Sequence, residues 1–355
     1  MLLLLPAMIC LYGCGGESSE TRAPSKESAP KAAQEKQEEP KAQANEEAKD
    51  KYTVCLLPKL KGIAYFTSCA EGAKKAAADL GDIDLIYDGP VDGSAEKQAS
   101  MIEKWTLQEV DVICVSPNAP DVVARAMKEA REAGIKVITW DADATPDSRS
   151  FFVNQATAQA IGYGLVDTMV NDLKEIGVEG GELAIVSASA TAANQNSWIE
   201  HMKTRLEKYP EFTLATIKYP GESQNKALQD SQDLINAFPE LKGIIGISSV
   251  SFPGAAEAVK QLGKAGGVLV TGLSTPNDMK GYVKEGVVKS VVLWNTEDLG
   301  YLTVCTAEAL ASGKLEPGAT SLDAGAIGEK KIEGDQVLLG DILVFNKDNI
   351  DQYDF

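Results

Sequence analysis

The chain has 355 residues, of which 44% are hydrophobic and 6% aromatic, enough for about two ordinary domains with a sizeable core. Its formal net charge of −18 argues against nucleic acid as a partner, because phosphate binding needs a basic face. The same charge argues against an anionic membrane surface or a polyanionic ligand.

The chain begins with the apolar run MLLLLPAMICLYGC and turns polar after Cys14. The run is shorter than the roughly twenty apolar residues of a membrane-spanning helix, and it is typical of a secretory signal without its basic start. Leu11-Tyr12-Gly13-Cys14 resembles a bacterial lipobox, although Tyr12 replaces the usual small residue. We expect residues 1–14 to be a signal peptide with a lipobox that lipidates Cys14. A plain signal peptide with an incidental cysteine is the alternative.

Residues 15–50 consist of Glu, Lys, Ala, Gln, Ser and Pro with almost no large apolar side chain. Such a segment cannot bury enough surface to offset the entropy of ordering it, so we expect a flexible tether. A tether between a lipid anchor and a domain places the protein in the periplasm or cell envelope, with the anchor as its only membrane contact.

From Tyr52 onward, strand-like and helix-like patterns alternate. The strand-like runs cover residues 52–57, 83–89, 110–117, 136–143, 149–155, 181–189, 212–221, 241–250, 267–274 and 289–295. Helical patterns begin near Thr67 and Ser94, cover 119–134 and 157–177, and begin again at Asn194, Ser223, Pro253 and Pro276. This alternation predicts βαβ units around parallel sheets, in an α/β fold.

The number of units is too large for one ordinary doubly wound sheet. Two similar halves forming two lobes with a cleft between them fit best, and a closed eight-fold barrel is the rival. In either fold, ligand-binding residues follow the ends of strands. The polar residues at these positions are Lys59, Asp88, Asn118, Asp141, Gln155, Asn194, Ser249 and Asn295.

Cysteine and histidine do not form a metal-binding pattern. Beyond residue 50, Cys55, Cys69, Cys114 and Cys305 have no C-x-x-C spacing, and His201 is the only histidine. We expect these cysteines to be buried small apolar residues, with a disulfide as the alternative. We expect neither a metal nor a cofactor, and His201 to lie on the surface of a helix.

No common catalytic motif is present. The first strand is followed by PKLKGIAYF rather than G-x-G-x-x-G, and the chain has no Walker loop, G-x-S-x-G or H-E-x-x-H motif. Asp141 and Asp143 are conceivable as an acid–base pair, but both face one side of a strand with no acid opposite. We therefore predict a protein that is not an enzyme.

Binding accounts for the same residues better. A carboxylate accepts hydroxyl hydrogen bonds, an amide both donates and accepts, and an aromatic face covers the apolar face of a sugar ring. The candidate ligand-binding residues on this basis are Asp141, Asn194, Gln195 and Asn295 with Phe66, Trp140 and Trp294. Core packing is the alternative for each tryptophan, and a capping role is the alternative for Asp141.

Several segments together resemble the solute-binding proteins of ribose/galactose-type ABC transporters, particularly the autoinducer-2-binding and rhamnose-binding members. They are PKLKGIAYFTS, VITWDADATPDSRSFFVNQ, NQNSW, LSTPNDM, LWNTEDLG and FNKDNIDQYDF, and the resemblance extends nearly from Tyr52 to Phe355. It implies the type I periplasmic binding protein fold, two doubly wound parallel-sheet lobes joined by a three-crossover hinge. The implied N-terminal lobe is 51–153 completed by about 276–318, and the C-terminal lobe is 154–275 completed by about 319–355.

The resemblance also implies site residues. The family's ligand-contacting lysine in PKL falls on Lys59, and the aspartate in TWD falls on Asp141. The family's Asp-Gln pair before N-x-W falls on Asn194 and Gln195, and its LWD aspartate falls on Asn295, so two carboxylates are replaced by amides.

The family's ligand-contacting proline and alanine fall on Pro253 and Ala255. An amide donates through its nitrogen where a carboxylate only accepts, so the two replacements disfavour autoinducer-2. We expect a monomer that binds a neutral sugar, such as a rhamnose-like deoxyhexose, and delivers it to the permease of an ABC importer. The alternatives are an autoinducer-2-binding protein, a sugar-sensing receptor that signals through a membrane partner, and an exported sugar-modifying enzyme.

Overall fold

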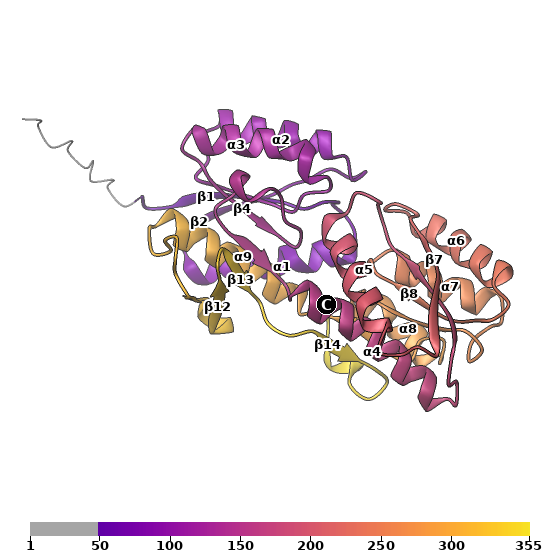
Figure 1. Ribbon diagram of the computed structural model, residues 1–355. Coiled ribbons are helices and arrows are strands. Elements are labelled where there is room, and N and C mark those ends of the chain that lie inside the picture. The colour runs from indigo at the N-terminus through magenta and orange to yellow at the C-terminus, as the bar shows by residue number, and fades with distance from the viewer. Residues whose placement is uncertain (1–48) are drawn as a thin grey trace, which may run out of the picture. The chain divides into compact units, whose positions relative to one another are not determined.

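The computed structural model describes residues 49–355. The predicted signal peptide, Cys14 and nearly all of the predicted tether lie outside the described residues. Within residues 49–355 the chain forms an α/β fold of two lobes, each built on its own sheet (Figure 1). No helix in this part of the chain combines the length and apolar character needed to cross a membrane.

The first lobe contains an eight-stranded sheet. Its order is β11 (Ser321–Asp323), β12 (Glu329–Glu333), β13 (Gln336–Leu338), β5 (Phe152–Asn154), β4 (Lys136–Trp140), β3 (Val112–Val115), β1 (Tyr52–Leu57) and β2 (Ile83–Tyr87). The strands from β13 to β2 are parallel, whereas β11 and β12 are antiparallel additions at one edge. Chain order reverses between β1 and β3, which is where an open α/β sheet forms a ligand crevice.

The second lobe repeats this arrangement. Its four-stranded sheet has the order β7 (Phe212–Lys218), β6 (Gly181–Val186), β8 (Leu241–Gly246) and β9 (Leu269–Gly272), and all pairs are parallel. A bridge from Leu273 to Val292 links β9 to β10 (Val291–Leu293), which pairs antiparallel with β14 (Leu343–Phe345). The reversal in this sheet lies between β6 and β8.

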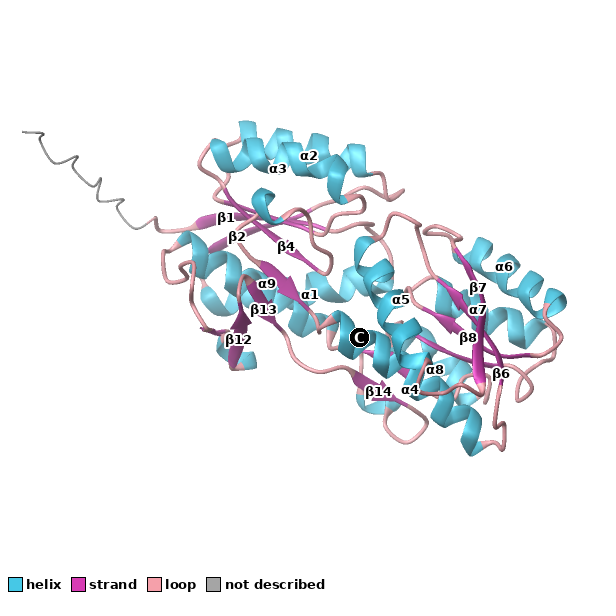
Figure 2. Cartoon of the chain, viewed as in Figure 1, coloured by secondary structure: helices cyan, strands magenta, loops and turns pink. Residues whose placement is uncertain are grey.

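Helices pack in pairs against the sheets (Figure 2). In the first lobe, α1 (Ala64–Leu80) packs on α9 (Thr296–Ala311) and α2 (Ala95–Leu107) on α3 (Pro120–Glu132). In the second lobe, α4 (Ala158–Glu175) packs on α5 (Ala193–Leu206), α6 (Gln224–Ala237) on α7 (Ser251–Gln261), and α8 (Pro276–Lys284) lies beside α7. Short 3-10 turns are η1 (Pro146–Ser148), η2 (Gly325–Ile327) and η3 (Ile350–Gln352).

Alternate residues of β1 enter separate cores. Val54 and Leu56 belong to the cluster under α1 and α9, whereas Cys55 and Leu57 belong to the cluster under α2 and α3. This is the two-residue period of a strand covered on both faces, and it explains why β1 is a continuous apolar run. All four cysteines predicted to be buried small residues are buried and free, which excludes a disulfide within the described part of the chain.

Close packing of α1 on α9 depends on two glycines. A Cβ at Gly72 would lie 1.8 Å from the carbonyl oxygen of Glu297, and one at Gly300 would lie 1.8 Å from that of Cys69. Each helix therefore presents bare backbone to the other. This contact holds the start of α1, which carries several site residues, against the first sheet.

The chain passes between the lobes at 155–157, 294–295 and 339–342, in agreement with a three-crossover hinge. The strand pairing divides the last segments differently from the predicted ranges. Residues 321–338, expected in the C-terminal lobe, form β11 to β13 and extend the first sheet through pairing of Val337 with Val153. Conversely, 276–293, expected in the N-terminal lobe, form α8 and β10 of the second lobe. The β13–β5 pairing joins strands 182 residues apart, and no local pattern marks it.

Candidate functional site

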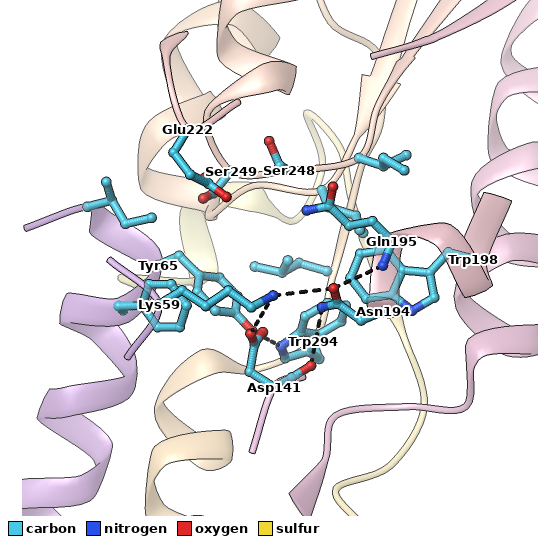
Figure 3. A pocket seen from close by; sticks show the side chains of 15 residues that line it. Lys59, Tyr65, Asp141, Asn194, Gln195, Trp198, Glu222, Ser248, Ser249 and Trp294 are labelled. Atoms are coloured by element: carbon cyan, nitrogen blue, oxygen red, sulfur yellow. Dashed lines mark hydrogen bonds and ion pairs between the residues drawn. The ribbon is translucent and has the colours of Figure 1, made fainter. Parts of the chain in front are cut away.

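A cavity lies where the carboxyl ends of strands from both sheets meet (Figure 3). It encloses about 460 Å³, counting the part open to solvent. Its walls follow the ends of β1, β4, β6, β7, β8, β9 and β10. The lining residues are Lys59, Ile63, Tyr65, Phe66, Asp141, Asn194, Gln195, Trp198, Glu222, Ile247, Ser248, Ser249, Leu273, Leu293 and Trp294.

Asp141 ends β4 in an unusual backbone conformation. Its φ is 62°, in the left-handed region that few residues other than glycine adopt and that Asp tolerates better than most. Three hydrogen bonds hold this turn: the Ala142 amide donates to the Trp140 carbonyl (2.6 Å), and the Gln155 and Asn194 side-chain amides donate to the Asp141 carbonyl (3.0 and 3.4 Å). The turn directs the carboxylate into the cavity.

The Asp141 carboxylate is 5% exposed and is surrounded by donors. The Tyr65 hydroxyl donates to Oδ1 at 2.8 Å, and the Ser116 hydroxyl donates to Oδ2 at 2.8 Å. Lys59 Nζ, whose side chain is also buried, lies 3.4 Å from Oδ2. A buried polar group is costly unless it is paired and hydrogen-bonded, and these three neighbours supply partners for both oxygens of Asp141.

Asn194 connects the two lobes. Its Oδ1 accepts from Lys59 Nζ (3.3 Å) and from the Gln195 backbone amide (2.9 Å), while its Nδ2 donates to the Asp141 carbonyl (3.4 Å). Figure 3 shows these bonds as a continuous chain across the cavity. An aspartate could accept from Lys59 but could not donate to a carbonyl, so the amide is the functional group that this position requires.

Gln195 is oriented by the end of β6. Its Oε1 accepts from the Ser187 hydroxyl (2.7 Å) and from the Ala188 amide (2.8 Å), and the side chain is 6% exposed. With its oxygen bound twice, the amide nitrogen is the atom of Gln195 that can donate to a ligand in the cavity.

Aromatic side chains form an apolar wall. Trp294 on the second crossover makes edge contacts with Tyr65 (6.1 Å between ring centroids) and Trp198 (6.2 Å), and Tyr65 makes another with Phe66 (5.0 Å). Trp294 Nε1 donates to the Tyr65 hydroxyl at 3.0 Å. Burial, reinforced by the neighbouring Asp141 carboxylate, raises the pKa of Tyr65 well above its usual value, so this hydroxyl remains a donor. Such a wall suits the apolar face of a sugar ring.

Two residues considered from the sequence have structural roles. Trp140 is fully buried behind the cavity, packs against Phe66 (5.6 Å between centroids), and donates from Nε1 to the Cys114 carbonyl. Asp143 accepts two hydrogen bonds from Arg149, at 2.9 and 2.6 Å, and does not line the cavity. Trp140 therefore packs in the core, and Asp143 cannot act with Asp141 as an acid–base pair.

Three predicted site residues lie outside this cavity. Asn295 accepts the Asp298 amide (3.1 Å) and so caps the N-terminus of α9. Ala255 is fully buried in α7, and Pro253 lines a neighbouring cavity next to Ser249 instead. The side-chain oxygen of Asn295 is bound to the first turn of α9, and its role as a ligand contact stays a prediction.

Apart from Ser249, which the sequence marks as a polar residue at a strand end, the remaining lining residues were not predicted as site residues from the sequence. Tyr65 adjoins Phe66 in α1, Trp198 lies one turn beyond Asn194 in α5, and Ser248, Ser249 and Glu222 follow β8 and β7. The spacing of Trp198 from Asn194 and Gln195 could have revealed it, since residues three and four apart share a helix face. Within residues 49–355, no group of three or more His, Cys, Asp or Glu side chains could hold a metal ion.

Comparison with known proteins agrees with this geometry. The family described as the periplasmic binding protein domain matches residues 54–315. Among curated proteins, the ribose import binding protein of Salmonella typhimurium is 23% identical over 271 residues, covering 76% of this chain and 88% of that protein.

Solved structures include more similar chains. A sugar ABC transporter protein from Actinomyces odontolyticus is 34% identical, with 86% of this chain and 98% of that one covered and a TM-score of 0.70. LsrB from Clostridium saccharobutylicum, in complex with AI-2, is 30% identical, with 85% and 100% covered and a TM-score of 0.81. An ABC transporter solute-binding protein from Clostridium phytofermentas with bound L-rhamnose is 28% identical, with 85% and 98% covered and a TM-score of 0.79.

Proposed function

The chain belongs to the periplasmic binding protein family, and from that premise we propose that it captures a neutral sugar between its lobes and presents it to an ABC importer. The family consists of substrate-binding proteins rather than enzymes, and its members are exported. One observation carries the proposal: Lys59 and Asp141 of the first lobe and Asn194 and Gln195 of the second face one cavity with an aromatic wall. Amide and charged groups there match hydroxyls, and the rings match a sugar's apolar face.

The ligand that we favour is a deoxyhexose such as L-rhamnose. The rhamnose-bound relative supports it, and so does Asn194, whose amide replaces the aspartate expected from the family resemblance. Autoinducer-2 is the second candidate, favoured by the similarity to the AI-2-bound LsrB. A ligand that needs two carboxylate acceptors is disfavoured, because the site offers a carboxylate at Asp141 but an amide at position 194.

Binding would act through lobe closure. Lys59 and Asp141 belong to the first lobe and Asn194 to the second, so a sugar that contacts all three stabilises the arrangement in which the lobes meet. Hinged closure around a ligand requires a few crossover segments that absorb the motion, and this chain has three. The closed complex is then the form that the permease recognises.

We further propose that a lipid on Cys14 anchors the monomeric protein to a membrane. Stable anchoring takes about two acyl chains, which a diacylated N-terminal cysteine supplies. Replacing Cys14 by Ser should move the protein from the membrane fraction to the soluble fraction of cells. If the wild-type protein is found in the soluble fraction, the lipid anchor is contradicted, whereas the sugar-binding proposal is unaffected.

The central experiment is a thermal-shift screen. L-rhamnose, D-ribose, D-galactose, D-arabinose and autoinducer-2 are each added to the purified protein. We expect at least one neutral sugar to raise the melting temperature, because a ligand at about one hundred times its Kd stabilises the folded state by about 2.7 kcal/mol. A shift with autoinducer-2 alone would establish the second candidate, and no shift with any of the five would contradict a sugar-binding function.

A further inference from the structure

Glu222 lies in the cavity with no partner of its own. It follows β7, immediately before Ser223, which caps the N-terminus of α6. Its side chain is half-buried and lines the cavity with Ser248 and Ser249, on the side opposite Lys59 (Figure 3). Within residues 49–355 it forms neither a hydrogen bond nor an ion pair, whereas Asp141 in the same cavity is bound by three donors.

The charges of the cavity are unbalanced. Its lining includes one cation, Lys59, and two carboxylates, Asp141 and Glu222. Lys59 is committed to Asp141 and Asn194, at 3.4 and 3.3 Å. The second carboxylate is therefore left for a group that enters the cavity.

Glu222 also lies close to the first lobe. Its Cγ lies 3.6 Å from where a Cβ of Gly93, in the first lobe, would stand, so the side chain reaches across toward that lobe. Burial raises the pKa of Glu222, Lys59 lowers it and Asp141 raises it again, for a net upward shift. The pKa of a carboxyl group shifts when a further charged group is placed beside it.

We propose that Glu222 is a specificity-determining residue that accepts a hydroxyl or ammonium donor from the bound sugar and excludes sugars that carry a carboxylate. The inference rests on the proposed sugar-binding function and adds to it the charge class of the ligand. An acidic sugar would bring a third negative group into a cavity with one lysine. A neutral sugar satisfies the unpaired carboxylate with a hydroxyl, and an amino sugar also offsets its charge.

The test is isothermal titration with D-galactose, D-galactosamine, D-galacturonate and L-rhamnose. The proteins compared are the wild type, Glu222→Gln, Glu222→Ala and the matched control Glu207→Gln, which removes the same charge from an exposed position in the same lobe. For the wild type we expect binding of a neutral sugar or the amino sugar, with D-galacturonate at least about tenfold weaker, a difference of about 1.4 kcal/mol.

In Glu222→Gln the ratio of the Kd for D-galacturonate to the Kd for D-galactose should fall by about tenfold. D-galactosamine should no longer bind more tightly than D-galactose. Glu222→Ala should lower the same ratio, and Glu207→Gln should retain the wild-type ratios. Unchanged ratios in both Glu222 variants would overturn the inference while sugar binding stands. Failure of all four sugars to bind the wild type, together with no thermal shift from any sugar of the screen, would contradict the proposed function and the inference with it.

Discussion

Asp141 and Asp143 are two residues apart, yet they have opposite environments. Asp141 faces the cavity and pairs with Lys59, whereas Asp143 faces away and is held by Arg149. One carboxylate should therefore matter to binding and the other to stability. This separation allows each residue to serve as the control for the other.

We expect Asp141→Asn to abolish detectable binding of the sugar identified in the thermal-shift screen while keeping a folded protein, because Asn tolerates the left-handed backbone of position 141. Asp143→Asn should retain the affinity but lose about 1.5–3 kcal/mol of stability, as expected for lost hydrogen bonds to a charged group. Calorimetric titration and urea denaturation measure the two effects. Normal binding by Asp141→Asn would remove Asp141 from the site.

Asn194 and Asn295 form a second matched pair. In Asn194→Asp, an oxygen replaces the nitrogen that donates to the Asp141 carbonyl, so the affinity for the screened sugar should fall by about 1–3 kcal/mol. Asn295→Asp should leave the affinity unchanged, because aspartate is as good an N-cap as asparagine and suits a helix N-terminus. Equal losses of affinity in both variants would support Asn295 as a ligand contact.

The sequence predicts six of the fifteen residues that line this cavity as ligand-binding residues. Lys59, Asp141 and Asn194 are marked by their positions after predicted strands, and Gln195 adjoins Asn194. Glu222 also follows a strand, but it stands in the turn-like segment YPGES, where an acidic residue looks like an ordinary solvated loop. Only the way in which the two lobes face each other shows that Glu222 lines the cavity. That arrangement cannot be recognised from a short stretch of sequence.

At the scale of elements, local periodicity predicts the helices that have one exposed face and misses α9. Nearly every residue of α9 from Leu299 to Leu310 is buried, so it has no polar stripe alternating with an apolar one. The strands β11 to β14 were not predicted either. Each of them is buried at only one position, so they lack the continuous apolar run that marks the short strands β5 and β10.

The α1–α9 contact makes a stability prediction. Gly72→Ala would place a methyl group 1.8 Å from the Glu297 carbonyl oxygen. The clash is between helix backbones, so relieving it requires α1 and α9 to move apart. We expect a loss of about 1–3 kcal/mol in the free energy of unfolding, the usual cost of overpacking. Gly281→Ala in α8 is the control: nothing lies within 4 Å of its added Cβ, and Ala should stabilise the helix by about 0.5–1 kcal/mol. Similar effects in both variants would mean that α1 and α9 are not tightly packed.

We expect Asp172 to make the stability of the second lobe depend on pH. It is a buried residue of α4, where burial raises the pKa of its carboxyl, with Ser290 donating to Oδ1 at 3.0 Å as an opposing influence. Because the folded pKa is above the unfolded value, the associated stability is present below the unfolded pKa and is lost as pH rises through the folded pKa.

Asp172→Asn should therefore raise the melting temperature relative to wild type at pH 7 by up to a few degrees, and much less near pH 3.5. The asparagine oxygen can still accept from Ser290, so no hydrogen bond is sacrificed. Thermal denaturation of both proteins across this pH range measures the difference. A melting-temperature difference that does not vary with pH would show that the Asp172 carboxyl is not responsible.

At the scale of the whole molecule, the site belongs to neither lobe alone. The first lobe supplies Lys59, Tyr65 and Asp141, and the second supplies Asn194 and Gln195. The repeated strand order places the carboxyl ends of both sheets at the cavity. The parallel-sheet patterns in the sequence favoured such a cleft between two lobes, with an eight-fold barrel as the rival. The lobe boundaries required the long-range pairing of β13 with β5.

A ligand bound to both lobes must favour the conformations in which they approach one another. We expect the screened sugar to lower the radius of gyration of the wild type in small-angle X-ray scattering. Asp143→Asn should show the same decrease, since the Arg149 pair lies outside the cavity. Asp141→Asn should show none at the same sugar concentration, because the first lobe then lacks the carboxylate that Lys59, Tyr65 and the sugar share. An unchanged radius in the wild type at saturating sugar would contradict closure, and with it our proposal that a permease recognises the closed complex.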